Sequence, residues 1–261
     1  MFDALYISAT GMQAQQLNVD TIANNLANVN TVGFKKGKVG FTDLMVREAA
    51  RLSGQEGVGL LAAESRVGAG VGIAGVWKSF DMGDLKKTES AYDVAIQGEG
   101  FLEVSMPDGT STYTRGGTFK LNSDGLLATS SGNPLKPRIA VPDNAQSMVI
   151  DGDGHVRVQV AGQSTPIEVG QLDLVRFTNP SGLLPQGDNL YRSSVDSGEA
   201  ISAKPAEDGM GTLAQGFLEG SNVKLTAEMV ELMVAQRVYE ANVKAIQAAD
   251  EMLGMINALR K

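Results

Sequence analysis

The sequence predicts an α+β fold in which an N-terminal and a C-terminal helix pair as a coiled coil, with an extended connector and an inserted antiparallel β-rich domain between them. Three observations support this prediction. Apolar residues near both chain ends recur with the mean spacing of about 3.5 residues that is typical of a coiled-coil seam. Glycine-rich sequence follows the first of these stretches. Short alternating segments separated by turn residues fill the middle and indicate a sandwich or a loose barrel.

Residues 219–261 are expected to form the C-terminal helix of a helical domain that both chain ends share. Proline is absent from residues 223 to 259, and Gly254 is the one glycine in that span. A helix of this span is about 55 Å long at roughly 1.5 Å per residue. A seam of this length needs a partner helix to cover it. The predicted assembly seam on this helix consists of Met229, Leu232, Tyr239, Val243, Ile246 and Leu253.

Residues 1–40 supply the partner, because they contain a second stretch with the same apolar spacing. Gly33 stands where a left-handed C-terminal cap would end this helix, and Phe34 follows as the apolar contact that often accompanies such a cap. The two chain ends are therefore expected to meet as a helical pair. Two helices that pack separately on a globular core are the alternative. The predicted seam on the first helix consists of Leu5, Met12, Val19, Ile22 and Leu26.

The other side of the first helix is almost free of charge, because only Asp3 and Asp20 are charged between Phe2 and Phe34. A helix that faces water normally carries Lys and Glu there. An uncharged face rich in amides suits burial against other protein surfaces, where amides can be hydrogen-bonded. We therefore expect neighbouring copies to cover this face, and the helix to be marginal in a monomer. The predicted inter-subunit amide face consists of Asn18, Asn24, Asn25 and Asn28.

The middle of the chain divides into a connector and a β-rich part. Residues 41–77 are expected to form an extended connector, with short helical potential from Asp43 to Leu52 and a glycine-rich continuation. A disordered linker is the alternative, although the apolar content is high for one. Residues 78–218 are expected to form the β-rich domain, because strand-length segments alternate with turn signals such as Pro107-Asp-Gly109 at intervals of roughly eight to twelve residues.

The sequence selects no catalytic, metal-binding or cofactor-binding residue, and we expect neither an enzyme nor a cofactor. There is no cysteine and a single histidine, His155, so Cys- and His-based metal sites and His-based triads lack their parts. Residues 70–75 match a dinucleotide fingerprint by letter, but no helix is expected to follow them. The net charge is −8, and the sequence contains no basic patch with interleaved aromatics. Nucleic acid is therefore not expected as a partner. The sequence contains no run of about 18 apolar residues, so it predicts no membrane span.

Segments at both ends and in the centre resemble bacterial flagellar rod and hook proteins. Ala9 to Phe34 is similar to the N-terminal signature of that family. Asp93 to Phe101 and Tyr113 to Phe119 resemble its shared β domain, and Leu218 to Val223 with Gln236 to Glu240 resembles its C-terminal helical segment. In length, in the single β domain and in the connector, the chain is most similar to distal rod members. Proximal rod and hook members are the nearest alternatives.

The resemblance implies a structural axial subunit that polymerises helically with itself into a hollow driveshaft and transmits torque across the periplasm. The terminal helices would line the inner tube, the β domain would form the outer wall, and the connector from Leu44 to Gly75 would wedge between subunits. The implied partners are other rod proteins, the hook protein, the surrounding ring proteins and the flagellar type III export apparatus. The implied location is the flagellar basal body, reached without a cleaved signal peptide. A monomeric binding module and a wall-cleaving enzyme are the alternatives from other classes.

Overall fold

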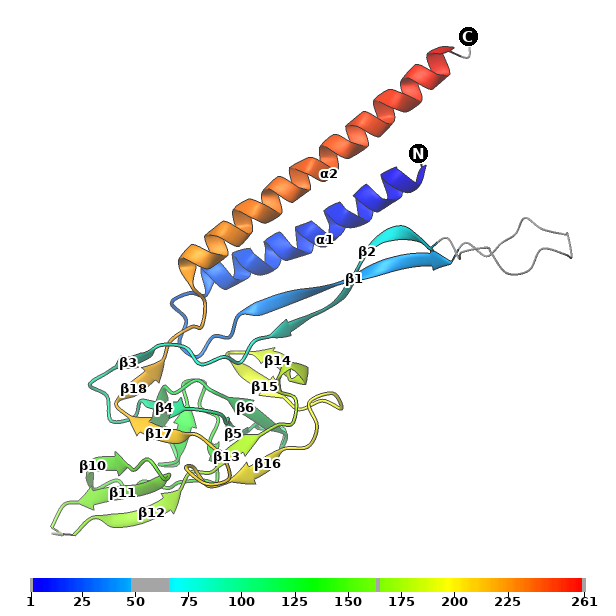
Figure 1. Ribbon diagram of the computed structural model, residues 1–261. Coiled ribbons are helices and arrows are strands. Elements are labelled where there is room, and N and C mark those ends of the chain that lie inside the picture. The colour runs from blue at the N-terminus through cyan, green and yellow to red at the C-terminus, as the bar shows by residue number, and fades with distance from the viewer. Residues whose placement is uncertain (1, 48–65, 163–164, 260–261) are drawn as a thin grey trace, which may run out of the picture. The chain divides into compact units, whose positions relative to one another are not determined.

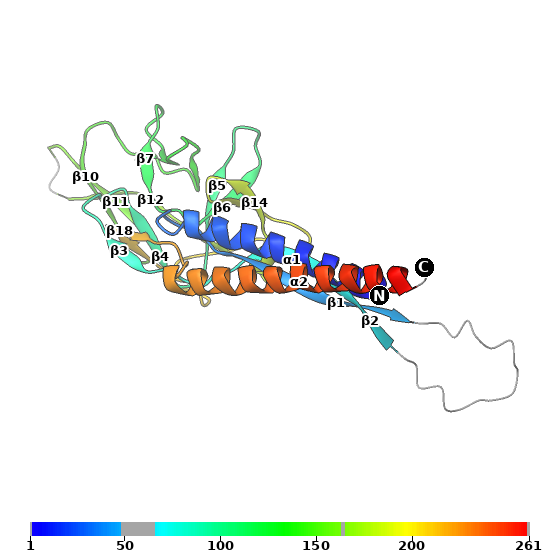
Figure 2. The same cartoon turned by 90° about the horizontal axis from the view of Figure 1, so that it is seen from above.

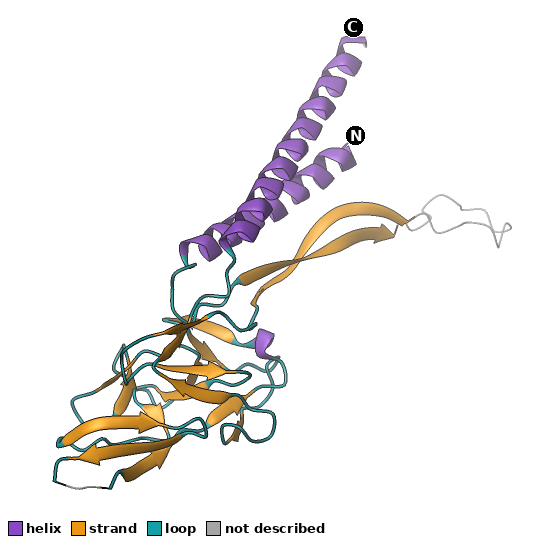
Figure 3. Cartoon of the chain, turned by 60° about the vertical axis from the view of Figure 1, so that its left-hand side comes forward, coloured by secondary structure: helices purple, strands orange, loops and turns teal. Residues whose placement is uncertain are grey.

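The computed structural model describes residues 2–47, 66–162 and 165–259 (Figure 1). The two ends of the chain are helices and the residues between them form strands, so the predicted α+β class is confirmed (Figure 3). The chain divides into two compact units. The helical unit comprises Met1–Leu26, Gly37–Trp77 and Leu225–Lys261, and the β unit comprises Ala27–Lys36 and Lys78–Lys224.

In the helical unit, α1 (Phe2–Ala27) and α2 (Leu225–Leu259) lie side by side and run in opposite directions (Figures 1 and 2). Asn25 bonds to Glu228 near one end of the pair. Further along, a Cβ atom at Gly11 would lie 2.9 Å from the Asn242 amide nitrogen, so glycine permits the close approach of the helices there. On its other side α1 contacts the third element of the unit, because the Val71 amide donates to the Thr10 hydroxyl at 3.4 Å.

That third element is a two-stranded ribbon formed by β1 (Gly37–Arg47) and β2 (Arg66–Lys78), which run in opposite directions (Figure 1). The ribbon corrects the expectation of helical potential at Asp43 to Leu52 as far as Arg47, and the rest of that segment lies outside the described residues. Cross-strand packing explains the difference, because a side chain at Gly40 would collide with the Trp77 ring. Glycine in this stretch therefore lets an indole lie across the ribbon.

The β unit is built from short strands whose described pairings are antiparallel. Its sheets have the orders β14-β15-β6-β5-β9, β10-β11-β12, β17-β4, β18-β3, β13-β16 and β7-β8. The strands are β3 (Leu85–Lys87), β4 (Val94–Gln97), β5 (Leu102–Ser105), β6 (Ser111–Thr114), β7 (Phe119–Leu121), β8 (Leu127–Thr129), β9 (Leu135–Lys136), β10 (Ala145–Ile150), β11 (His155–Val160), β12 (Ile167–Gln171), β13 (Leu174–Arg176), β14 (Leu184–Gly187), β15 (Leu190–Arg192), β16 (Ile201–Ala203), β17 (Thr212–Gln215) and β18 (Phe217–Glu219). A short 3-10 helix, Pro180–Gly182, precedes β14.

Two buried clusters hold the β unit together. The larger is mainly aliphatic and draws on alternating positions such as Val156, Val158 and Val160 of β11. The smaller is mainly aromatic, and its rings meet edge to face, with Tyr113 and Phe177 centroids 4.8 Å apart. Each fully buried side chain of this size contributes about 1.5–3 kcal/mol. These two cores stabilise the strands of the β unit against one another.

Candidate functional site

The least exposed residues of α2 follow one stripe with steps of three and four, as expected for a helix that packs along its length. Leu232, Ile246 and Leu253 of the predicted seam lie on this stripe and are partly buried, and Val243 beside it is also partly buried. Met229 of the predicted seam is 49 % exposed in the single chain. Smaller or polar residues occupy other positions of the stripe. They are Glu228, Ala235, Asn242 and Ala249.

The side of α2 that faces away from this stripe carries apolar side chains that are exposed in the described chain. We call this set the outer face of α2. Predicted seam residue Met229 belongs to it. Tyr239 does not: although 41 % exposed, it lies on the inner stripe between Ala235 and Asn242 and lines a hollow with Gln16 and Val19 of α1. Exposed apolar side chains gathered along one element mark a surface for protein contact. The outer face of α2 consists of Met229, Val230, Met233, Val234, Val238, Met252, Met255 and Ile256.

The predicted seam of α1 is only partly enclosed in the single chain. Ile22 is buried. Leu5, Met12, Val19 and Leu26 keep intermediate exposure. Each of these four therefore retains apolar surface that a neighbouring molecule could remove from water.

Asn25 lies inside the helical unit, in contrast to the expectation that it belongs to an inter-subunit face. Its amide nitrogen donates to the Gly37 carbonyl at 2.9 Å and to Glu228 Oε2 at 3.1 Å. Its amide oxygen accepts the Gly37 N–H at 2.8 Å. One buried amide thus joins α1, β1 and α2. The other members of the predicted amide face have more exposure: Asn24 is exposed, and Asn18 and Asn28 are partly buried.

A buried ionic centre lies in the β unit, formed by Lys35, Arg115 and Glu219. Glu219 Oε1 accepts a hydrogen bond from Lys35 Nζ at 2.7 Å, and Oε2 accepts one from Arg115 Nε at 2.9 Å. The side chains of Lys35 and Glu219 are 0 % exposed, and that of Arg115 is 3 % exposed. Pairing is what makes such burial tolerable, because an isolated charge in the interior is costly.

The pKa values in this centre respond to burial and to the neighbouring charges. Burial works to raise the pKa of Glu219, but the charges of Arg115 and Lys35 outweigh it and leave that pKa below its ordinary value. Burial lowers the pKa of Lys35, and Arg115 lowers it further, against the opposing effect of Glu219. The sequence did not reveal this centre, because its members are far apart along the chain.

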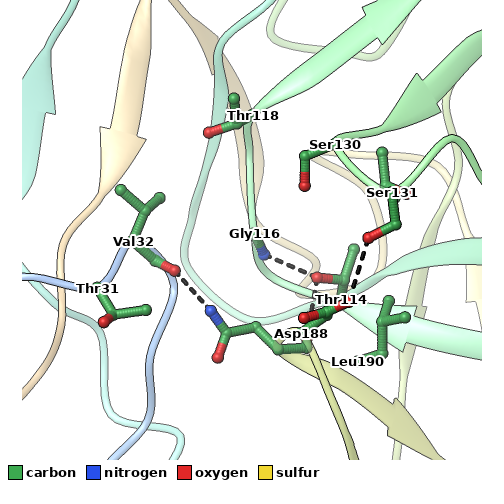
Figure 4. Close-up of a pocket in the computed structure, with 11 residues that line it drawn as sticks. Thr31, Val32, Thr114, Gly116, Thr118, Ser130, Ser131, Asp188 and Leu190 are labelled. Carbon is green, nitrogen blue, oxygen red and sulfur yellow. Dashed lines mark hydrogen bonds between the residues drawn. The ribbon is translucent and has the colours of Figure 1, made fainter. Parts of the chain in front are cut away.

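A small hydroxyl-lined pocket of about 200 Å³ lies elsewhere in the β unit (Figure 4). Thr114 Oγ1 accepts from the Gly116 N–H at 2.9 Å, and Ser131 Oγ donates to Asp188 Oδ2 at 3.2 Å. The Asn189 amide donates to the Val32 carbonyl at 2.7 Å. Each of these polar groups has a hydrogen-bond partner in the pocket lining. The Asn189–Val32 bond anchors the segment that contains Val32 to the turn between β14 and β15.

The part of the chain that the structure describes contains neither a cluster of metal ligands nor a membrane-spanning helix. No group of three or more His, Cys, Asp or Glu side chains in residues 2–47, 66–162 and 165–259 is placed to hold a metal ion. No helix within those ranges combines the length and apolar character of a membrane span. His155 lies on β11, where its Nδ1 is 2.7 Å from Glu168 Oε1 at the surface.

Comparison with known proteins gives matches at both ends and in the centre. A family model described as flagella basal body rod protein matches residues 5–35. The flagellar hook protein FlgE/F/G D1 domain matches residues 95–158, and the flagellar basal body rod FlgEFG protein C-terminal region matches residues 214–259.

Whole-chain relatives agree with these matches. The flagellar basal-body rod protein FlgG of Borreliella burgdorferi is 45 % identical and is matched over 100 % of both chains. The protein of the same name from Buchnera aphidicola subsp. Schizaphis graminum is 43 % identical over 99 % of this chain and 100 % of its own. The protein of that name from Caulobacter vibrioides is 41 % identical over 98 % of this chain and 99 % of its own.

Proposed function

Because the chain belongs to the family of flagellar basal-body rod proteins, which are structural subunits and not enzymes, we propose that it is an axial subunit of the distal rod. In this proposal many copies assemble helically into a hollow driveshaft that transmits torque across the periplasm. Torque transmission of this kind needs one heterologous contact that repeats along a helix without closing into a ring. Proximal rod and hook subunits are the alternatives within the family, and a monomeric binding module is the alternative outside it. The whole-chain relatives named FlgG favour the distal rod over these alternatives.

The outer face of α2 is the observation that carries the proposal. Val234 is 57 % exposed, and Met233 and Met255 have similar exposure. Full burial of a side chain of this size contributes about 1.5–3 kcal/mol, so covering the remaining half of each contributes on the order of 1 kcal/mol. A row of such contacts gives a stable interface from individually weak pieces, as a self-assembling polymer requires.

We infer that assembly completes the arrangement of the terminal helices. α1 and α2 would then pack as a coiled coil that lines the inner tube, with the predicted seam residues covered by neighbouring copies. The incomplete burial of Leu5, Met12, Val19 and Leu26 supports this inference. Asn18, Asn24 and Asn28 would contact neighbouring subunits. The β unit would form the outer wall, with its antiparallel sheets arranged as a sandwich or loose barrel.

The connector from Leu44 to Gly75 would wedge between subunits and keep the shaft straight; its residues 48–65 lie outside the described part of the chain. Exposed apolar side chains of the ribbon support this role, among them Phe41, Ile73 and Val76. Other rod proteins, the hook protein, the surrounding ring proteins and the flagellar type III export apparatus are the further proposed partners. The proposed location is the basal body in the periplasm, reached by export without a cleaved signal peptide.

The proposal is tested by placing a charge on the outer face of α2. Val234→Asp should abolish filament formation by concentrated purified protein, because every subunit contact would have to desolvate a carboxylate. Val149→Asp is the matched control, since it makes the same change at a valine of β10 that is 48 % exposed. Electron microscopy and sedimentation read out assembly. Filaments of Val234→Asp at the wild-type concentration would exclude this face as the assembly surface.

A further inference from the structure

Three segments of the β unit that are far apart in the sequence are tied together beside the ionic centre. They are residues 31–36, residues 79–83 and residues 219–222. The Gly33 N–H donates to the Glu219 carbonyl at 2.8 Å, and the Lys36 N–H donates to Asn222 Oδ1 at 2.8 Å. The Asn222 side-chain amide donates to the Ser79 carbonyl at 2.8 Å. The first and last of these segments are the ones through which the chain continues toward α1 and α2.

The Glu219 carboxylate accepts hydrogen bonds from three surrounding donors. Oε1 accepts both Lys35 Nζ and the Gly83 N–H, at 2.7 and 2.9 Å. Oε2 accepts Arg115 Nε at 2.9 Å. Lys35 Nζ also donates to the Asp81 carbonyl at 2.7 Å. One side chain therefore links the segment before the ribbon, the segment after it and the segment before α2.

Arg115 fixes the position of this carboxylate relative to the β core. Its guanidinium donates to the carbonyls of Gly100 and Gly98 at 2.9 and 3.0 Å and lies over the Phe101 ring at 5.9 Å. Without Glu219, two buried cations would face each other across the space it leaves. Removal of one partner from such a buried group is far more damaging than loss of a surface pair.

We propose that Glu219 is a positioning residue that locks residues 31–36 and 219–222 to the β unit as one piece and so presents both terminal segments for assembly. The lock closes late, because it needs Lys35, Arg115 and Glu219 together and therefore nearly the whole β unit. A chain that has not yet folded as far as Glu219 keeps its terminal segments loose. The consequence for assembly rests on the proposed function, whereas the lock itself does not.

Hydrogen exchange on the dilute full-length chain tests the lock. Glu219→Gln keeps the shape of the side chain and removes its charge. The amides of Gly33, Lys36 and Gly83 should exchange faster together, by about tenfold or more, as expected for loss of a charged buried partner. Amides of β11 such as Val156 and Val158, which lie away from the lock, should show a smaller rise, set by the lower stability of the whole β unit. Glu103→Gln is the matched control, because it removes a carboxylate from the exposed pair with Lys136 and should leave the three reporter amides unchanged.

The outcomes separate a lock from general stabilisation. Faster exchange in only one of the two segments, or an equal rise throughout the β unit, would overturn the proposal. Lys35→Met provides a second decision if Glu219→Gln does not fold, because it leaves the Arg115–Glu219 pair intact and should still loosen both segments together. The double variant Lys35→Met with Glu219→Gln should recover part of the Gly83 protection, since it removes one of the two unneutralised cations.

Filament formation by the same proteins tests the consequence for assembly. Glu219→Gln should assemble poorly beside a wild-type protein that forms filaments. Filaments as abundant as those of the wild type, despite loosened reporter amides, would overturn the positioning role. A wild-type protein that forms no filaments would count against the proposed function and would leave the exchange result standing.

Discussion

At the residue scale, the charge on Glu219 makes the β unit sensitive to acid. Arg115 and Lys35 lower the pKa of Glu219 below its ordinary value of 4.5, although burial alone would raise it. A carboxylate with a lowered folded-state pKa adds stability at pH values above the unfolded-state pKa, and that stability is lost as the pH falls through the folded-state value. The pKa of Lys35 is also lowered from its ordinary value of 10.5, mainly by burial.

This sign gives a pH-dependent expectation. Glu219→Gln should destabilise the β unit near neutral pH by about 3–5 kcal/mol, as is usual when a buried charge loses its partner. The difference from the wild type should begin to shrink as the pH falls below about 4.5, where the unfolded carboxylate takes up a proton, and should vanish only below the lowered folded-state pKa, where the wild-type carboxylate is neutral too. Urea unfolding followed from about pH 7 to about pH 3 measures this. A difference that stays constant over that range would contradict the assignment of the acid sensitivity to Glu219.

At the element scale, the two sides of α2 are expected to respond differently to the same substitution. Leu232 is partly buried on the inner stripe, whereas Val234 lies on the outer face. Leu232→Asp should loosen the α1–α2 pair by roughly 2–4 kcal/mol, because it places a carboxylate where an apolar side chain was enclosed. It should therefore prevent assembly as well.

Limited proteolysis of the dilute chain measures this difference. Leu232→Asp should make α1 and α2 more susceptible to cleavage while the β unit resists as in the wild type. Val234→Asp should leave the dilute chain as resistant as the wild type and fail only at assembly. Equal resistance of both variants in the helices would show that the inner stripe does not hold the pair.

The same contrast explains how far the sequence could predict the helices. Heptad spacing placed helices at both chain ends, and Leu232, Ile246 and Leu253 lie on the inner stripe. The alternate positions could not be predicted from apolar character, because close packing favours small residues such as Ala235 there. Larger neighbours such as Met229 remain outside.

Other features depend on contacts between residues that are distant along the chain. Helical potential from Asp43 gave way to a strand because the segment pairs with β2 across the ribbon. The motifs that resembled the flagellar family contained both Arg115 and Glu219. Periodicity cannot pair residues whose separation along the chain is 104 positions. For the same reason the sequence did not predict that Asn25 is buried within the helical unit. Its amide could be read from the sequence, but its hydrogen-bond partners Gly37 and Glu228 could not.

At the scale of the whole molecule, the ribbon is expected to control the stiffness of the assembled shaft. Gly72 lies against the Thr42 and Leu44 side chains, so residues 43 and 72 face each other across the ribbon. Replacement of residues 44–71 with an Asn-Gly turn, which suits a two-residue hairpin, should leave the rest of the ribbon paired. The variant should form filaments that bend more than the wild type. A Gly/Ser replacement of residues 48–65 at equal length is the control. It keeps the length of the segment and changes only its sequence, so it separates the two effects.

Bending is measured as the persistence length of the filaments in electron micrographs. Shortening of the ribbon should lower it, because a segment that wedges between subunits resists their relative tilt. Filaments of the shortened variant as straight as those of the wild type would remove this role from the ribbon.

The ordering of α1 links the whole molecule to its assembly. In the single chain four of its five predicted seam residues are only partly buried. Fixing each backbone residue costs about 1–2 kcal/mol, and partial burial returns less than the roughly 1.5–3 kcal/mol of a fully buried side chain. Neighbouring copies that cover Leu5, Met12 and Val19 would supply the missing part. Helix content should therefore rise as subunits assemble.

Far-ultraviolet circular dichroism across a concentration series, with filament content followed by sedimentation, measures this coupling. The wild-type signal per residue should become more helical over the concentrations at which filaments appear. Val234→Asp should keep the dilute value at every concentration, since it cannot assemble. Helicity that stays constant while wild-type filaments form would mean that both terminal helices are already complete in the monomer. Assembly would then join rigid parts, and the exposed apolar surface of α1 would need another explanation.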